Sequence, residues 1–249
     1  MRIEWQKEKQ DLMKSTRNSN ALVIVQARVG STRLPAKIAL DFNGVPMLVS
    51  LLNRLNISES KFHGVVATSL EKRDDLVEEL ALSCGWGVHR GSESDVLSRY
   101  AGAYAEHGEG VETVIRICSD NPLLGLHEIE EVYARFRDSE MDFLANANGP
   151  DVHEDGFAVE VFYSSCLIEA DKKATEAYDR EHVCPWIKRN YAMDYTQLDG
   201  RYKEKLSVDT VEDFLRVREL NKRLKPGFTI SDVCDLMIKE RKRDAKESI

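Results

Sequence analysis

The sequence has no apolar run that approaches the roughly 20 residues needed to cross a bilayer. It also has no surplus of basic residues, because 35 lysines and arginines stand against 43 aspartates and glutamates, a net charge of −8. A balance of this sign argues against a general binder of nucleic acids or membrane surfaces. We therefore expect no nucleic-acid partner and no membrane association.

The cysteines form no C-x-x-C pair, and their number is odd. Scattered thiols of this kind argue against a disulfide framework or a zinc site and are typical of a reduced, cytoplasmic protein. They are Cys84, Cys118, Cys166, Cys184 and Cys234.

No Pro-, Gly- or Ser-rich linker, internal repeat or low-complexity tract divides the 249 residues. Residues 1–20 are polar and charged, with no apolar segment like that of a signal peptide. We therefore expect a polar leader over residues 1–20 and a single domain over residues 21–249.

Short apolar runs alternate with amphipathic segments in the first half of the chain. The runs predict buried strands over residues 21–26, 64–68, 87–89 and 111–117. The segments that follow them predict helices over residues 46–55, 74–84, 95–107 and 127–137. This alternation is typical of a parallel sheet with helices on both faces, wound like a nucleotide-binding fold.

The second half of the chain is less regular. It predicts strands over residues 142–147, 158–163 and 206–208, a helix over residues 180–189, and another helix after Asp209. Together the halves predict an α/β, Rossmann-like domain with a mixed, mostly parallel sheet.

The loop after the first strand, residues 26–37, carries an unusual local charge. No acidic residue occurs from Ala21 to Leu40, where the overall frequency of acids would give about three. Arginine forks and a lysine suit phosphate oxygens, while Gly and Ser let backbone N–H groups approach an anion. The residues concerned are Arg28, Gly30, Ser31, Arg33 and Lys37. A phosphate-binding loop is the favoured interpretation, and a solvated basic loop is the alternative.

Two common phosphate-binding motifs are absent from this loop. It matches neither the Walker A pattern G-x-x-x-x-G-K-[ST] nor the dinucleotide turn G-x-G-x-x-G. The sequence therefore disfavours a P-loop NTPase and a Rossmann dehydrogenase.

Instead, residues 27–37, Ala-Arg-Val-Gly-Ser-Thr-Arg-Leu-Pro-Ala-Lys, resemble the CTP-binding loop of the CMP-sugar synthetases. This cytidylyltransferase family includes the acylneuraminate and 3-deoxy-manno-octulosonate enzymes, and the chain is most similar to its branch of the spore coat polysaccharide protein SpsF. Further similar segments follow in the family's order up to residue 213: residues 41–47, 66–69, 90–100, 116–123, 155–161, 180–183 and 207–213. The resemblance implies the nucleotide-diphospho-sugar transferase fold.

The resemblance implies a magnesium site made by Asp120 and Asp209, which lie 89 positions apart and each follow a predicted strand. Mg²⁺ prefers one or two carboxylates together with phosphate oxygens and water. Taken singly, Asp120 could instead cap the turn before Pro122, and Asp209 could be the N-cap of the next helix.

The resemblance also assigns the remaining site residues. Arg28 and Lys37 contact the triphosphate and carry catalysis, with Lys37 at the α-phosphate. Ala27, Gly30, Ser31 and Arg33 complete the phosphate cradle. Thr68 and Ser92, expected on loops, and Asp95 border the base or ribose, although Asp95 could equally be a helix N-cap. Arg116, Glu160, Arg180 and His182 lie on the acceptor side, and His182 could instead be structural.

The chain departs from the family pattern at two positions. Ser119 stands where the family usually has Gly before the first metal ligand. Ala36 stands where Gly often precedes the loop lysine, which indicates that this position does not require a positive φ.

The implied reaction is attack by a sugar hydroxyl on the α-phosphate of CTP, with release of pyrophosphate. The implied partners are CTP and a small sugar acceptor, by default a keto-sugar acid, in a cytoplasmic homodimer that supplies activated sugars for surface glycans. One alternative is a sugar-1-phosphate nucleotidyltransferase, which usually carries a G-x-G-x-R loop that is absent here. A GT-A glycosyltransferase would normally show D-x-D where residues 118–122 read Cys-Ser-Asp-Asn-Pro. A catalytically silent nucleotide-binding protein is the third alternative.

Overall fold

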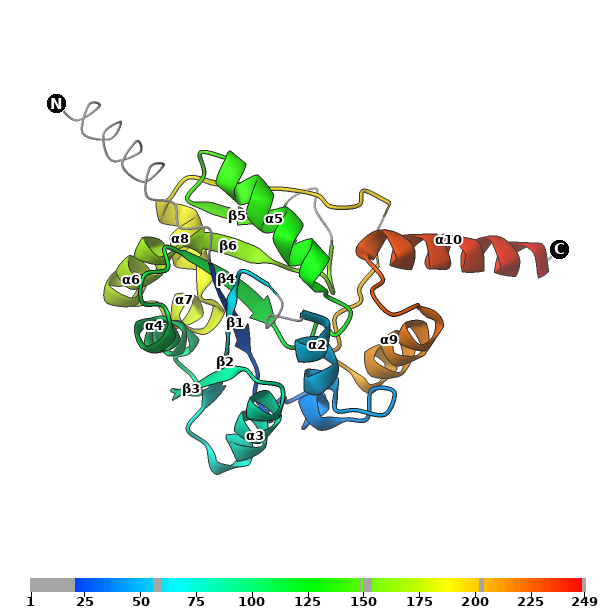
Figure 1. The fold of residues 1–249 in the computed structure, drawn as a ribbon, viewed down its shortest axis with the longest axis horizontal. Coiled ribbons are helices and arrows are strands. Elements are labelled where there is room, and N and C mark those ends of the chain that lie inside the picture. The colour runs from blue at the N-terminus through cyan, green and yellow to red at the C-terminus, as the bar shows by residue number, and fades with distance from the viewer. Residues whose placement is uncertain (1–20, 56–59, 148, 150–153, 202–203, 248–249) are drawn as a thin grey trace.

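The computed structural model describes residues 21–55, 60–147, 149, 154–201 and 204–247. The expected leader over residues 1–20 lies outside this range. The described chain forms one sheet with helices on both faces, as Figure 1 shows. This confirms the predicted fold class.

The sheet has the strand order β3-β2-β1-β4-β6-β5-β7. Its first half is parallel: β1 (Ala21–Gln26) pairs with β2 (His63–Ser69) and with β4 (Thr113–Cys118), and β2 pairs with β3 (Gly87–Gly91). In the second half β6 (Glu160–Tyr163) runs antiparallel between β4 and β5 (Phe143–Ala145). The edge strand β7 (Met193–Tyr195), which the sequence did not predict, is parallel to β5.

Strand β1 is buried on both faces because it lies in the middle of the sheet. Leu22 and Ile24 pack on one face with α4 (Val96–His107), α6 (Ser164–Lys173) and α8 (Cys184–Asn190). Val23 and Val25 pack on the other face. That face is covered by α2 (Met47–Leu55), α3 (Asp75–Ser83), α5 (Leu126–Asp138), α9 (Val211–Arg223) and the start of α10 (Ile230–Glu247). The continuous apolar run of this strand therefore has the burial that a central parallel strand requires.

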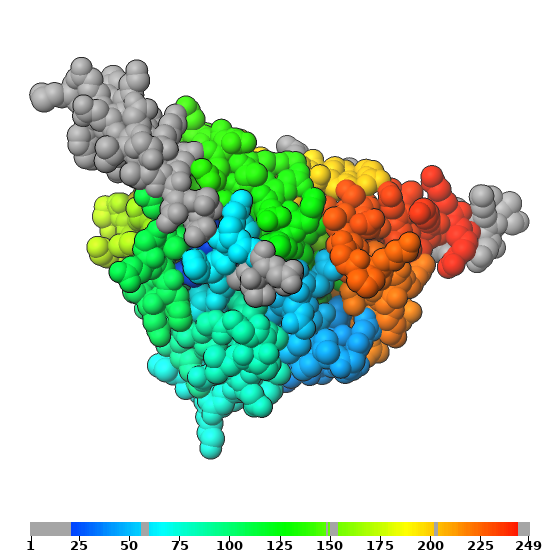
Figure 2. All heavy atoms as spheres, viewed as in Figure 1, coloured from blue at the N-terminus to red at the C-terminus, as the bar shows by residue number. Residues whose placement is uncertain are grey.

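Helix α9 packs against residues 42–43, which follow the 3-10 helix η1 (Lys37–Ala39) and precede α2. The rings of Phe42 and Phe214 lie 6.1 Å apart, and Asn43 Nδ2 donates to the carbonyl of Arg218. In Figure 2 the orange surface of α9 borders the blue surface of this segment. These contacts join α9, near the end of the sequence, to the residues that follow the loop after β1.

Two elements differ from the sequence-based predictions. The predicted helix over residues 180–189 is split into α7 (Ala177–His182) and α8, with Val183 at φ 68° between them. Pro185 in the first turn of α8 explains the break, because its ring lacks an N–H and would clash inside a continuous helix. Residues 206–208 are not a β-strand, although the backbone N–H of Val208 donates to the carbonyl of Asp120 at 2.8 Å.

The five cysteines are free thiols. Within the part of the chain that is described, none of the helices has the length and apolar character to cross a membrane.

Candidate active site

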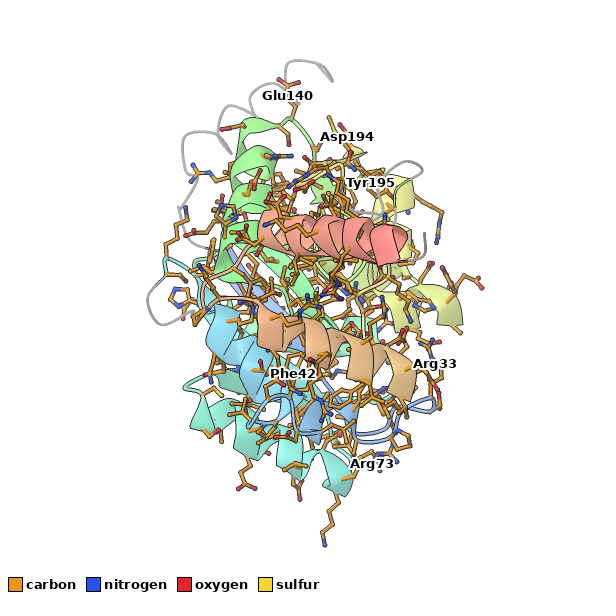
Figure 3. The ribbon with its side chains drawn as sticks, turned by 90° about the vertical axis from the view of Figure 1, so that its right-hand side faces the viewer. Arg33, Phe42, Arg73, Glu140, Asp194 and Tyr195 are labelled. Carbon is orange, nitrogen blue, oxygen red and sulfur yellow. The ribbon has the colours of Figure 1, made fainter. Side chains whose placement is uncertain are left out.

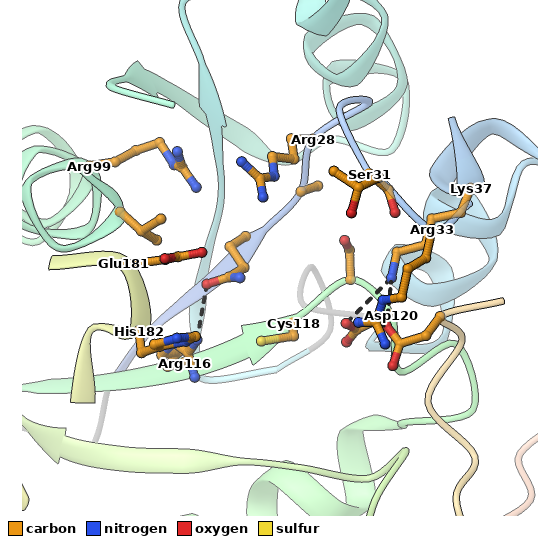
Figure 4. Close-up of a pocket in the computed structure, with 16 residues that line it drawn as sticks. Arg28, Ser31, Arg33, Lys37, Arg99, Arg116, Cys118, Asp120, Glu181 and His182 are labelled. Carbon is orange, nitrogen blue, oxygen red and sulfur yellow. Dashed lines mark hydrogen bonds and ion pairs between the residues drawn. The ribbon is translucent and has the colours of Figure 1, made fainter. Parts of the chain in front are cut away.

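A pocket of about 290 Å³ lies at the carboxyl ends of β1 and β4. Strands β2 and β3 lie on one side of β1, and β4, which follows them in the sequence, lies on the other side. The ends of β1 and β4 therefore form the switch point of the sheet, where open α/β folds bind ligands. Figure 4 shows its lining side chains. The predicted site residues that line it are Ala27, Arg28, Ser31, Arg33, Lys37, Arg116, Asp120, His182 and Asp209.

The loop after β1 is held in shape by its own backbone. The carbonyl of Val29 accepts hydrogen bonds from the N–H groups of Ser31 at 2.8 Å and Ala36 at 3.0 Å. The buried carboxylate of Asp74, in the short 3-10 helix η3 (Lys72–Asp74), accepts from the N–H of Val29 at 2.7 Å. The side-chain ends of Glu93 and Arg73 lie over Gly30, and a Cβ at this position would come within 2.8 Å of Glu93 Oε1 and displace it. The loop is therefore anchored before any ligand binds.

Ala36 corrects one of the expectations from the sequence. Its φ is 55°, so this position does adopt the left-handed conformation that glycine favours. The conformation costs an alanine about 1 kcal/mol. Ala36 is the N-cap of the 3-10 helix η1 (Lys37–Ala39), and its left-handed conformation turns the chain into this helix, which starts with the buried Lys37.

Lys37 lies between the two predicted metal ligands. Its Nζ is 3.5 Å from Asp120 Oδ2 and 3.6 Å from Asp209 Oδ1, and it donates to the carbonyl of Val208 at 2.6 Å. Arg33 pairs with the same Asp209 oxygen at 2.9 Å, and Figure 3 shows Arg33 beside the start of α9. The structure thus brings together the basic loop and two carboxylates that are far apart in the sequence.

Neither carboxylate serves as a helix cap. The N-cap of α9 is Thr210, whose hydroxyl accepts from the N–H of Asp213 at 3.2 Å. The N-cap position of α5 is Gly125, and the side chain of Asp120 points to Lys37. The alternative role as a helix N-cap is therefore excluded for Asp209, and the side chains of both residues line the pocket.

The two carboxylates differ in their electrostatics. Burial raises the pKa of Asp120, and the charge of Asp209 adds to this while Lys37 opposes it. For Asp209 burial also disfavours ionisation, but a hydrogen bond from Lys205 and the charges of Lys37 and Arg33 lower its pKa overall. Two neighbouring carboxylates repel each other when both are ionised, and a nearby cation stabilises the ionised forms. Lys37 supplies one positive charge to the pair.

On the side of the pocket that was predicted to bind the acceptor, Arg116 lines the pocket from β4, and neighbouring side chains hold its guanidinium in place. It contacts Glu160 through Nη1 and Gln26 Oε1 through Nη2 at 3.1 Å. Glu160 is also paired with Lys188 at 3.0 Å; although burial opposes ionisation, Arg116 and Lys188 lower the pKa of Glu160 to about 2. Glu160 does not line the pocket, so its interactions are those of a residue that positions Arg116.

Several predicted residues lie elsewhere. Asp95 is the N-cap of α4 and accepts from Arg180 at 2.7 and 2.9 Å, so these two bind each other outside the pocket. Thr68 lies within β2, fully buried, and the expectation that it is on a loop is wrong because the strand continues to Ser69. Ser92 lies on the loop after β3 and lines a neighbouring hollow.

His182 does line the pocket, from the end of α7, with its ring 4.4 Å from that of Tyr178. The remaining lining residues, which the sequence did not predict as site residues, are Gln26, Thr32, Val96, Arg99, Cys118, Ser119 and Glu181. Arg99 had a signal, because it falls on the same face of the predicted helix as the apolar residues Val96 and Tyr100. An arginine among buried positions indicates a specific role.

Comparisons with known proteins identify the family of the chain. A model of the cytidylyltransferase family matches residues 22–226, a range that contains the basic loop, Asp120 and Asp209. An uncharacterized protein of Methanocaldococcus jannaschii is 35% identical over 205 residues, which is 80% of this chain and 82% of that protein. The spore coat polysaccharide biosynthesis protein SpsF of Bacillus subtilis is 28% identical over 232 residues, or 88% of this chain and 94% of SpsF.

Among solved structures, a cytidylyltransferase from Leptospira borgpetersenii superimposes with a TM-score of 0.81 at 29% identity. The match covers 89% of this chain and 95% of that one. The comparisons thus reach across most of the chain and confirm the resemblance seen in its motifs.

Proposed function

This chain belongs to the cytidylyltransferase family, and from that premise we propose that it transfers CMP from CTP to a hydroxyl of a sugar acid, releasing pyrophosphate. In such a transfer the nucleotide phosphates and the leaving pyrophosphate are anionic, so positive charge around the α-phosphate lowers the barrier most. One observation carries the proposal. Lys37 Nζ lies 3.5 and 3.6 Å from Asp120 and Asp209 beneath a basic loop that has no acid of its own.

Asp120 and Asp209 fit the donor set that Mg²⁺ prefers, namely one or two carboxylates completed by phosphate oxygens and water. Their side chains retain 31% and 16% of their exposure at the pocket, so an ion can reach both. The described residues contain no group of three or more His, Cys, Asp and Glu that could hold a metal, so the other ligands of an ion at these two carboxylates would have to be phosphate oxygens and water. When bound there, the ion would neutralise phosphate charge and polarise the α-phosphate.

Different basic residues then bind different phosphates of the triphosphate. Figure 4 shows Arg28 and Lys37 on opposite sides of Ser31. Lys37 donates to an α-phosphate oxygen, and its bond to the carbonyl of Val208 holds its charge at a fixed place. Arg28 and Arg33 hold the outer phosphates, and the backbone around Gly30 and Ser31 lets these oxygens approach closely.

The acceptor enters from the β4 side of the pocket, where Arg116 and His182 face it. Arg116 is oriented by Glu160 and Gln26, and its planar fork suits the carboxylate of a sugar acid. For a keto-sugar acid the attacking group is the anomeric hydroxyl. The name of SpsF, a spore coat polysaccharide biosynthesis protein, supports a product used in surface glycans.

The test is pyrophosphate release from CTP with Mg²⁺ or Mn²⁺ and a panel of acceptors. The panel contains keto-sugar acids, their reduced analogues without the anomeric hydroxyl, neutral sugars and sugar 1-phosphates. We expect release with a keto-sugar acid only, and none with Asp209→Asn. Release with sugar 1-phosphates alone would favour the NDP-sugar synthetase alternative. Absence of release with every acceptor, despite binding of CTP, would favour a silent nucleotide-binding protein.

We also propose that the protein acts as a homodimer in the cytoplasm, following the family resemblance and its free cysteines. Light scattering of the purified protein measures the mass directly. A monomeric mass at micromolar concentration would contradict the dimer.

A further inference from the structure

His182 lines the pocket as the last residue of α7, and its side chain is exposed there. Its ring lies 4.4 Å from that of Tyr178, one turn earlier in the same helix. Within the described part of the chain, neither ring nitrogen of His182 takes part in a hydrogen bond or an ion pair. Both nitrogens are therefore available to a ligand in the pocket.

The short helix that carries His182 is fixed to its neighbours by Arg180. The guanidinium of Arg180 lies 2.7 Å from the carboxylate of Asp95, at the start of α4, and 2.7 Å from that of Asp171 on α6. Helix α7 also packs directly on α4. The imidazole is therefore presented by an element that is held on two sides before any ligand binds.

The residue after His182 has a strained backbone. Val183 has φ 68° and ψ −60°, a conformation that β-branched residues rarely adopt, and its side chain is fully buried. Strain of this kind persists only where the surroundings impose it, and it gathers at functional sites. Here it ends α7 at His182 and so keeps this side chain at the rim of the pocket.

The position of His182 indicates which part of the reaction it meets. Figure 4 shows His182 and Arg116 at one end of the pocket, and Lys37 and Asp120 at the other. In the proposed reaction Arg116 binds the carboxylate of a keto-sugar acid, and Lys37 binds the α-phosphate. The carboxylate and the anomeric hydroxyl of such an acid are attached to the same carbon. A side chain at the Arg116 end of a pocket of about 290 Å³ can therefore reach the hydroxyl that attacks.

We propose that His182 is the general base that takes the proton of the attacking hydroxyl. The inference rests on the proposed transfer of CMP to a sugar hydroxyl. A neutral imidazole has one nitrogen that accepts a hydrogen bond, and histidine is the side chain that most often serves as a general base. As the hydroxyl oxygen bonds to the α-phosphorus, the bond from phosphorus to the leaving pyrophosphate breaks, with its electron pair on the pyrophosphate oxygen. The hydroxyl proton passes to His182, and the imidazolium later releases it to water.

Other charged and titratable groups surround His182. They are Glu181 and Tyr178 on α7, Arg180 with Asp95 and Asp171, Arg116 and Cys118 on β4, Arg99 on α4 and Arg28 on the loop after β1. Glu181 is the alternative base among them. It also lines the neighbouring hollow beside Ser92 and Glu93, which His182 does not. Glu181 is therefore included in the test.

The experiment measures kcat/KM for a keto-sugar acid as a function of pH, from pyrophosphate release with CTP and Mg²⁺. Glutamine can form hydrogen bonds but cannot take up the proton. We expect His182→Gln to lower kcat/KM about 10²–10⁴-fold and to lose the rise of kcat/KM with pH on the acid side. The KM for CTP should stay within about twofold. Glu181→Gln should keep the acid-side rise.

His63→Gln is the matched control. His63 is also an exposed histidine, but it is the first residue of β2, at the end of this strand away from the pocket. This variant should match the wild type at every pH. Added imidazole gives a second readout: it should restore part of the rate of His182→Ala and leave His63→Ala unchanged. A merely structural role of His182 would not respond to imidazole.

A His182→Gln variant that keeps the acid-side rise would overturn the inference and leave the proposed function standing. So would the absence of rescue in His182→Ala, or loss of the rise in Glu181→Gln alone. A wild type that uses only sugar 1-phosphates would overturn both, because a phosphate oxygen attacks without losing a proton. A wild type that releases no pyrophosphate with any acceptor would also overturn both.

Discussion

Replacing Lys37 with methionine removes the cation between Asp120 and Asp209 while keeping the length of the buried side chain. At separations of 3.5 and 3.6 Å each attraction amounts to about 5 kcal/mol at an effective dielectric constant near 20. The two carboxylates keep partial access to water, so the net loss of unfolding free energy should be about 1–3 kcal/mol, below the full cost of an unpaired buried ion. Chemical denaturation without metal measures this loss.

The same variant should lose catalysis far beyond its loss of stability. A fixed donor at the charge that develops on the α-phosphate contributes about 10²–10³-fold to kcat, and Lys37→Met should fall by that factor in pyrophosphate release. In the absence of nucleotide the variant should bind Mn²⁺ more tightly in calorimetry, because the competing cation is gone from the two carboxylates.

Lys205→Met is the matched control. Lys205 pairs with Asp209 at 3.0 Å, but its side chain is 41% exposed and does not line the pocket. This variant should keep kcat within about tenfold of the wild type. A Lys37→Met enzyme with kcat within about threefold of wild type, or with unchanged Mn²⁺ binding, would refute the placement of Lys37 at the reacting phosphate.

Three further predictions concern the support of the site. Gly156→Ala should destabilise the protein by more than about 2 kcal/mol and lower activity, because φ is 96° and the new Cβ would come within 2.6 Å of Leu206, near Asp209. The control Gly227→Ala has φ 78° and open space around the new Cβ, so it should lose only the backbone strain of about 1 kcal/mol. Equal losses of unfolding free energy in urea for the two variants would contradict this prediction. Burial raises the pKa of Glu154 from 4.5 to about 6, so the folded state binds this proton more tightly than the unfolded state does. The unfolding free energy should therefore fall as the pH rises from 4.5 through 6. Glu154→Gln should lack this dependence of the unfolding free energy on pH. Thr210→Ala removes the N-cap of α9 and should cost about 1 kcal/mol in unfolding free energy, whereas a cost near zero would show that the cap contributes nothing.

Strands β1, β2 and β4 of the parallel half of the sheet were predictable because each contains a short, β-branched run that is largely buried. The loop after β1 was predictable for a different reason, since its charge departs from that of an acidic chain. The split between α7 and α8 also had a signal in Pro185, which is incompatible with one continuous helix. What had no signal is the positive φ of Val183, at 68° with ψ at −60°, which a β-branched residue adopts only when its surroundings impose it.

The site itself was predicted unevenly. Lys37, Asp120 and Asp209 came from motifs and do converge, although residues 206–208 reach the site as an extended segment bound to Asp120 and not as a strand. Asp95 and Arg180 carry the right chemistry for ligand binding but satisfy each other. Such pairing depends on which helices pack together, and local sequence does not encode it.

The central claim is that the α-phosphorus of CTP passes to the acceptor. It is tested by supplying CTP labelled with ³²P at either the α- or the γ-position, with Mg²⁺ and a keto-sugar acid. We expect the α-label in a sugar-linked CMP and the γ-label in pyrophosphate, and we expect neither product from Asp209→Asn. Transfer of the γ-label to the sugar, or recovery of the α-label only as free CMP, would contradict it.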